Sequence, residues 1–163
     1  MSSYKKIIAS GCSFTQHLDS WAYCLAEDFP EISVVNTGIG GAGNYIISRT
    51  CISATQDALS SGLKPEEIFV IVQWSSMYRK SMIANRNVNS GAEFMWDGCA
   101  GDNTFKSSII NHNSSKMTAC AGKRKNFDFW KKYFSAFWSD EKAFVSTLED
   151  ILFTQAFLES RGI

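Results

Sequence analysis

The run Ile68-Phe69-Val70-Ile71-Val72 is apolar at every position and is the strongest structural signal in the chain. A strand with one face in water alternates apolar and polar residues, whereas a strand buried on both faces does not. We therefore expect these residues to form a strand of a parallel sheet that helices cover on both sides.

Further strands and helices are predicted in the residues that precede this run. Residues 5–10 and 32–35 are predicted strands, and apolar residues recur every three to four positions in predicted helices over about 20–29 and 45–61. The resulting order β-α-β-α-β, with short connections, favours an α/β fold with a doubly wound parallel sheet.

The whole chain, residues 1–163, has the length of a single domain. Residues from about 80 to 125 are rich in Asn, Ser, Gly and Lys without a sustained period, which predicts a long irregular insertion, either a lid or partly disordered. After this insertion the chain is predicted to be helical again from Phe127. Ser139 is expected to cap the last helix, because acidic residues fill the first turn that follows it.

Composition excludes several classes of protein. Lysine and arginine number 16 and acidic residues also 16, so the net charge of zero argues against a nucleic-acid binder. The chain has no apolar run long enough for a membrane span and no signal peptide, which predicts a cytoplasmic protein. The five cysteines lack C-x-x-C spacing and indicate free thiols. We expect no metal and no organic cofactor, because no His, Cys and Asp cluster has ligand spacing.

Three loops are expected at the carboxyl ends of the predicted strands, where α/β sheets bind ligands. They contain Gly11-Cys12-Ser13-Phe14-Thr15, the glycine-rich segment 38–44, and Gln73-Trp74-Ser75-Ser76. If a helical turn follows the first strand, Ser13 lies at the start of that turn. In this position it could either act as a nucleophile or simply cap the helix.

The first two loops carry a family resemblance. Gly11-Cys12-Ser13-Phe14-Thr15 resembles the GDSxT block of the SGNH, or GDSL-type, hydrolases, and Asn36-Thr37-Gly38-Ile39-Gly40-Gly41 resembles their second block. The resemblance covers most of residues 4–78 and looks closest to compact variants in phage and marine bacterial sequences. It implies a flavodoxin-like, three-layer α/β/α sandwich and a serine esterase or acylhydrolase acting on an ester of a carbohydrate or lipid. The resemblance is compatible with a protein located in the cytoplasm or associated with a virion.

The resemblance also implies roles for individual residues. Ser13 matches the nucleophile, and the N–H groups of Ser13 and Gly41 match two donors to the oxyanion. The family's third donor is an asparagine, for which either Ser76 at the matching place or Asn44 in the neighbouring loop would stand; Asn44 is equally suited to cap the helix that starts at Tyr45. Apart from the resemblance, Arg79 follows the third loop and either binds an anionic group of the substrate or is an ordinary exposed arginine.

Two positions depart from the family pattern. Cys12 replaces the aspartate of the first block, and we expect burial to keep it a protonated thiol. The family's base is the histidine of a C-terminal D-x-x-H block, which this sequence does not contain. His17 and His112 are the candidate bases, and neither follows an aspartate at that spacing.

Strands 4 and 5 of the family fold are also missing, so we expect an incomplete SGNH domain. The strand at 68–72 would then be an apolar edge with unpaired backbone groups. We expect either residues 80–125 or a second chain in a symmetric dimer to cover that edge.

A second function is compatible with the same loops. A non-catalytic module would bind a glycan or another ligand in the inherited pocket, with aromatic residues such as Trp74, Tyr78 and Trp96 either stacked on a sugar or packed in the core. Nucleotide binding through segment 38–44 is a weaker third alternative, because the acidic residue expected about 20 positions after the glycine pattern is not at that spacing, although Asp57 is not far from it.

Overall fold

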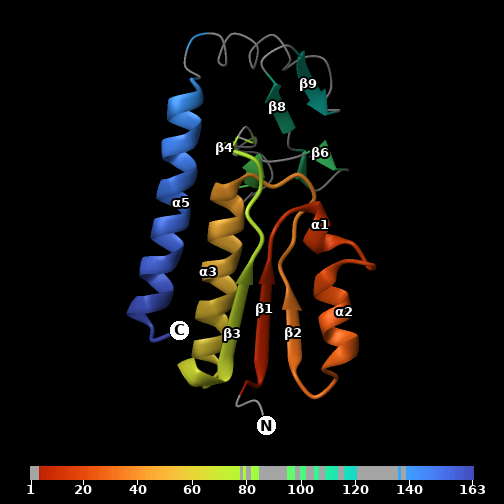
Figure 1. Ribbon diagram of the computed structural model, residues 1–163, viewed down its shortest axis with the longest axis vertical. Helices are drawn as coiled ribbons and strands as arrows, with labels where there is room; N and C mark the ends of the chain where they lie inside the picture. The colour runs from red at the N-terminus through yellow and green to blue at the C-terminus, as the bar shows by residue number, and fades with distance from the viewer. Residues whose placement is uncertain are drawn as a thin grey trace, which may run out of the picture.

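The computed structural model has a central sheet of three parallel strands. It describes residues 4–77, 79, 136 and 139–163, and the backbone of short strands between 82 and 120. The strands are β1 (Lys6–Ser10), β2 (Ser33–Asn36) and β3 (Ile68–Val72), in the order β2-β1-β3 (Figure 1). Pairing is parallel throughout this sheet, with Ile8 level with Val35 on one side and Val70 on the other. The predicted α/β class and parallel sheet are confirmed.

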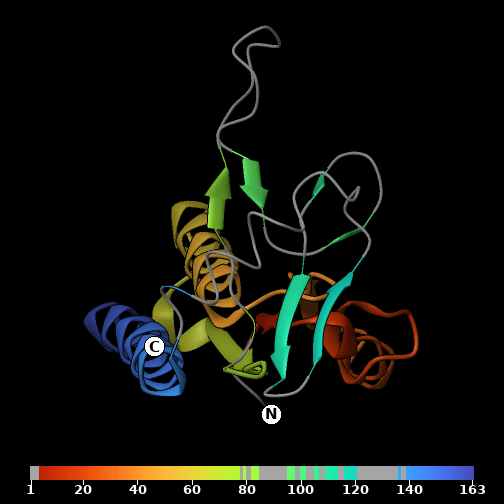
Figure 2. The ribbon, with the colours of Figure 1, turned by 90° about the horizontal axis from the view of Figure 1, so that it is seen from above.

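Helices lie on both sides of this sheet. The helices are α1 (Ser13–Gln16), α2 (Trp21–Asp28), α3 (Asn44–Ser60), the short 3-10 helix η1 (Pro65–Glu67) and α5 (Asp140–Ser160). Helix α2 packs on β2, α3 packs on β1 and β3, and α5 packs on α3. Seen from above, α2 lies on one side of the sheet, and α3 and α5 lie on the other (Figure 2).

The core lies between the sheet and α3. Alternate residues of neighbouring strands point to the same face, so Ile8 and Ile68 meet Ala58 of α3 in one buried cluster. Ser10 is buried on the same face, where its hydroxyl donates to the carbonyl of Ile47 at 3.0 Å. The polar side chain therefore satisfies its hydrogen bond inside the core.

Small and polar residues join α5 to α3. Ala143 and Thr154 are the buried positions of α5, and the Thr154 hydroxyl lies 2.7 Å from that of Ser48. Thr154 also lies 2.8 Å from the carbonyl oxygen of Asp150, one turn earlier in its own helix. Because these side chains are small, the two helices can approach closely while their hydroxyls remain paired.

Helix ends follow the sequence signals in part. The Ser139 side chain accepts from the Lys142 N–H at 3.1 Å, which confirms the predicted cap of α5. Helix α2 starts after Ser20, but the Ser20 hydroxyl donates to the carbonyl of Thr15 at 2.7 Å instead of capping its own helix. Gly62, with a φ of 94°, turns the chain after α3.

The expectation that β3 is buried on both faces is wrong. Ile68 faces α3 and is buried, but Phe69, on the opposite face, is 43% exposed and stacks against Tyr4 with ring centroids 5.1 Å apart. The reason is that β3 is the edge strand of this sheet and α2 covers β2 instead. Coverage of this edge by residues 80–125 or by a second chain stays a prediction.

The described strands between residues 82 and 120 pair with one another rather than with the central sheet. They form three antiparallel pairs: β4 (Met82–Ala84) with β5 (Met95–Asp97), β6 (Ala100–Gly101) with β7 (Phe105–Lys106), and β8 (Ile109–Asn113) with β9 (Lys116–Cys120). The composition of the segment predicted no strands, because runs this short carry no readable alternation. The helix predicted from Phe127 lies outside the described residues. Among the helices that are described, none combines the length and the apolar character needed to cross a membrane.

Candidate functional site

Ser13 lies where the chain leaves β1 and enters α1. The carbonyl of Cys12 accepts the N–H groups of Thr15 and Gln16, both at 3.0 Å, and this pair of bonds makes the turn helical directly after the strand. Ser13 is the first residue of α1 and is half-buried. The predicted position of Ser13, at the carboxyl end of the first strand, is therefore confirmed.

The loop after β2 packs directly against α1. A Cβ on Gly38 would lie 2.6 Å from the Gln16 backbone nitrogen, so a larger residue there would push the two loops apart. A Cβ on Gly40 would lie 2.7 Å from Oε1 of the Gln16 side chain, which can move aside. The Ile39 N–H also donates to the Gly11 carbonyl at 3.1 Å. The glycine-rich segment is thus built for close approach to the Ser13 turn.

Gly41 has a φ of 76°, a left-handed conformation that favours glycine. The turn from Ile39 to Ala42 is closed by a 3.0 Å bond from the Ala42 N–H to the Ile39 carbonyl. A positive φ at the third residue of such a turn is typical of type II, whose closing bond does not use the N–H of that residue. Ala42 then packs in one buried cluster with Cys12, which brings the turn beside the start of α1.

A polar network joins the ends of all three strands. Asn36 donates to the Thr15 carbonyl at 2.6 Å and accepts from the Gly38 N–H at 2.9 Å. Gln73, directly after β3, accepts from the Thr15 hydroxyl at 2.9 Å and from the Trp21 indole at 3.1 Å. Sequence reasoning missed Gln73, although a polar residue at the carboxyl end of a strand was a usable signal.

Asn44 connects three segments in this structure. Its amide nitrogen lies 3.2 Å from both the Ser75 carbonyl and the Thr147 hydroxyl, and its Oδ1 accepts from the Ser75 N–H at 2.7 Å. Both amide hydrogens therefore have acceptors within the protein. To act as the predicted oxyanion donor, Asn44 would have to release one of these bonds.

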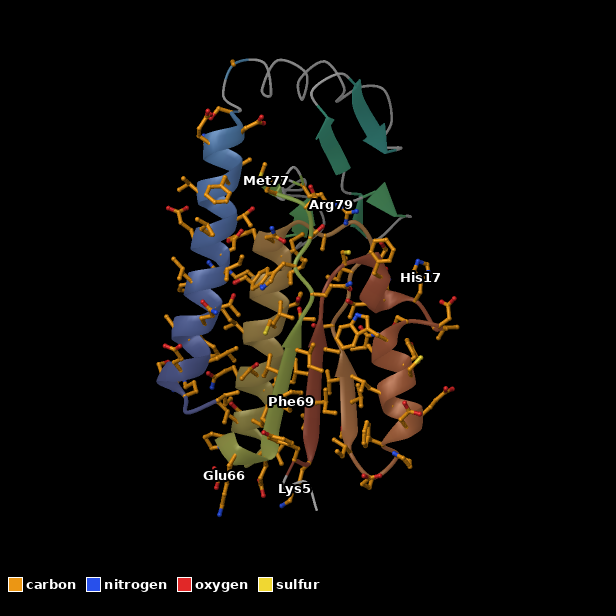
Figure 3. The ribbon with its side chains drawn as sticks, viewed as in Figure 1. Lys5, His17, Glu66, Phe69, Met77 and Arg79 are labelled. Carbon is orange, nitrogen blue, oxygen red and sulfur yellow. The ribbon has the colours of Figure 1, made fainter. Side chains whose placement is uncertain are left out.

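The loop after β3 holds the other predicted residues. Trp74 is half-buried and packs against the cluster of Cys12, Ala42 and α3 residues, so its ring contributes to the core. Ser76 is exposed, and its carbonyl accepts the Arg79 N–H at 3.1 Å. Arg79 is half-buried and is labelled in Figure 3, above the carboxyl end of the sheet.

Cys12 differs from the predicted inert thiol. Burial by itself raises its pKa, but the Phe14 N–H, the Arg79 guanidinium and the Ser13 hydroxyl outweigh burial, so the pKa of Cys12 is lowered. The Phe14 backbone and the side chains of Arg79 and Ser13 lie close to the sulfur. The side chains of Cys12, Ser13 and Arg79 are therefore neighbours at the site.

No histidine of the described side chains stands at this cluster. His17 is exposed and lies on the outer side of the connection between α1 and α2, away from Arg79 (Figure 3). The His112 side chain lies outside the described residues. Within the described part of the chain, His, Cys, Asp and Glu residues form no group of three that could hold a metal ion.

Comparison of the chain with models of protein families, with curated proteins and with solved structures finds no match. The resemblance to the SGNH hydrolases therefore depends on the loop motifs and on the positions that those motifs occupy at the end of the sheet.

Proposed function

We propose that this chain is a serine esterase or acylhydrolase of the SGNH type, with Ser13 as its nucleophile. The observation that carries the proposal is the packing of the glycine-rich loop onto the Ser13 turn at the carboxyl end of the sheet. The left-handed Gly41 supports it, because the closing bond of its turn leaves the Gly41 N–H for another acceptor.

In this mechanism the Ser13 hydroxyl oxygen attacks the carbonyl carbon of an ester. The N–H groups of Ser13 and Gly41 donate to the oxyanion that forms, and the alcohol leaves to give an acyl-serine. Water then hydrolyses this intermediate and releases the acid. Ser76 is the proposed third donor, while Asn44 holds the loop after β3 in place.

The proton of Ser13 requires a general base, which takes it as the hydroxyl attacks and then gives it to the leaving alcohol. His17 is exposed on the outer side of the site, so His112 is the candidate that we propose. Replacement of a general base lowers kcat by about 100- to 10,000-fold. His112→Ala should therefore lose activity by that factor, whereas the matched variant His17→Ala should keep it. Equal activities of the two variants would remove His112 from the mechanism.

Hydrolysis of 4-nitrophenyl acetate tests the proposal, with released nitrophenolate as the readout. Ser13→Ala should lower the rate by about 100-fold or more, because residual turnover comes only from the oxyanion donors and from binding. Ser33→Ala, a change at an exposed serine at the start of β2, is the matched control. A folded Ser13→Ala protein with an unchanged rate would overturn the esterase proposal.

Because His17 is exposed on the outer side of the site, it does not serve as a base for Ser13. This favours one alternative, a non-catalytic module that binds a glycan or another ligand at the same loops. Calorimetry with acetylated oligosaccharides distinguishes the two functions. Binding without any hydrolysis that depends on Ser13 would favour the module, whereas acetate release that depends on Ser13 would favour the esterase.

A further inference from the structure

Arg79 has an unusual electrostatic environment at the candidate site. Its guanidinium contacts the Cys12 thiol beside Ser13, yet its Nη1 atom is buried and has no hydrogen-bond partner. Among the side chains that the structure describes, this nitrogen is the one buried polar atom left without an acceptor. The contact with Cys12 therefore leaves a donor of the cation unused.

Leaving such a donor unpaired is unfavourable. A guanidinium keeps its positive charge in proteins, and a buried donor without an acceptor lowers stability, more so when it is charged. The ion pair found between described residues joins Lys5 to Glu67 at 2.6 Å, at the end of the sheet where β1 and β3 begin. Lys5 and Arg79 lie at opposite ends of the central sheet in Figure 3, so that pair does not neutralise Arg79.

We propose that Arg79 binds an anionic group, a carboxylate or a phosphate, that the substrate carries close to its scissile ester. This inference rests on the proposed function, because it takes Ser13 as the reacting group. The contact between Arg79 and Cys12, the residue next to Ser13, sets the short distance between the anion and the ester. Guanidinium donors form charge-assisted hydrogen bonds with either kind of oxyanion.

The chemistry of Arg79 makes it a specificity-determining residue. A hydrogen bond to a charged group contributes about 1.5–3 kcal/mol, equivalent to a preference of about 10- to 150-fold. An anionic ester should therefore react with a higher kcat/KM than a neutral ester of similar reactivity. The preference should depend on Arg79 and not on the other cationic side chains of the surface.

The kinetic test compares 4-nitrophenyl acetate with the mono-4-nitrophenyl ester of succinic acid, which carries a carboxylate. The wild-type protein should prefer the succinate ester, and Arg79→Gln should lower the ratio of the two kcat/KM values by about tenfold or more. The control Arg49→Gln removes an exposed arginine on α3 that stacks on Tyr45, and it should leave the ratio unchanged. Equal ratios in wild type and Arg79→Gln would overturn the inference.

Arg79→Lys guards against a merely structural effect. Lysine keeps the charge but offers no planar donor group, so it should retain part of the preference while circular dichroism shows an intact fold. If both variants lower the rates on the two esters by equal factors, Arg79 supports the fold alone and the inference is wrong.

Calorimetric titration with succinate and with inorganic phosphate separates this inference from the proposed function. Binding of either anion that Arg79→Gln weakens by about tenfold would support the anion site, and the tighter ligand would identify its chemistry. If the wild-type protein shows no hydrolysis that depends on Ser13 but still binds an anion through Arg79, the esterase proposal is overturned and the anion site is not. Absence of binding by both anions would overturn the anion site.

Discussion

Cys12 and Cys51 are both buried, at 3% and 0% exposure, but their acidities change in opposite directions. Cys51 lies on α3 within the core, and burial raises its pKa to about 11. At Cys12 burial also acts to raise the pKa, but the donors at the end of the sheet outweigh it and the pKa is lowered. The core excludes charge, whereas the candidate site is arranged to stabilise a negative charge.

The same contrast holds for the groups around the two cysteines. The core under α3 pairs each described polar side chain with a protein acceptor, as Ser10 does with Ile47. At the end of the sheet, Arg79 presents a buried donor without one. Full pairing is typical of a region that contributes stability, while the unpaired nitrogen of Arg79 is the donor that the proposed anion site would use.

Truncation of Ile8 should have the largest effect on stability. Ile8 is fully buried between the sheet and α3, so Ile8→Ala should lower the free energy of unfolding by about 2–5 kcal/mol in urea denaturation. The conservative change Ile8→Val should cost about 0.5–1.5 kcal/mol. Equal, small losses for both variants would show that α3 does not cover the main core.

The raised pKa of Cys51 predicts a loss of stability in alkali. Because the folded-state pKa lies above the unfolded value of 9.0, the contribution is complete below pH 9 and is lost as the pH rises toward about 11. A shift of this size corresponds to about 2–3 kcal/mol. Chemical denaturation at a series of pH values should show this loss.

Cys51→Ala is the variant that isolates this effect, because other groups also titrate in alkali. Its free energy of unfolding should fall less steeply with pH than that of the wild type. Cys12→Ala should change the slope in the opposite sense, since the lowered pKa of Cys12 adds stability as the pH rises. Parallel pH profiles for all three proteins would contradict the difference between the two cysteines.

Asn44→Ala should have an intermediate effect on stability, because it removes the clamp between the loop after β3 and α5. The half-buried N–H and carbonyl of Ser75 would lose their Asn44 partners, with an expected cost of about 1–3 kcal/mol in the free energy of unfolding. Thr147→Val removes one of the three contacts of Asn44 and should cost less. If Thr147→Val costs as much as Asn44→Ala, the clamp to Ser75 is not the main contribution.

Phe69→Ser should have the smallest effect, because Phe69 lies on the exposed face of the edge strand. We expect a change within about 1 kcal/mol in thermal or chemical denaturation, far below the cost of Ile8→Ala. A much larger loss, or dissociation of a dimer seen by light scattering, would show that this face is covered in solution. A monodisperse monomer would contradict coverage of β3 by a second chain.

The sequence predicted the local elements of the fold well. Residues 68–72 form β3 as expected, and Ser139 caps α5, because apolar runs and capping residues act over a few positions. The exposure of Phe69 was not predictable from the same run. It depends on which helix lies over which strand, which is a property of the tertiary structure.

The candidate site was predictable in its positions but less so in its contacts. The places of Ser13 and Gly41 follow from loop motifs that are local in sequence. The clamp of Asn44 with Thr147 joins residues far apart in the chain, and no local pattern indicates such a pair. The lowered pKa of Cys12 likewise depends on Arg79, which reaches it only after β3 has paired with β1.

Whether Ser13 is an activated nucleophile can be measured by reaction with a fluorophosphonate followed by peptide mass spectrometry, because this reagent labels a serine that oxyanion donors activate. We predict one phosphonyl adduct on the peptide that contains Ser13, and none on that peptide in Ser13→Ala. A folded wild-type protein that stays unlabelled, or that carries the adduct at any residue other than Ser13, would contradict this prediction.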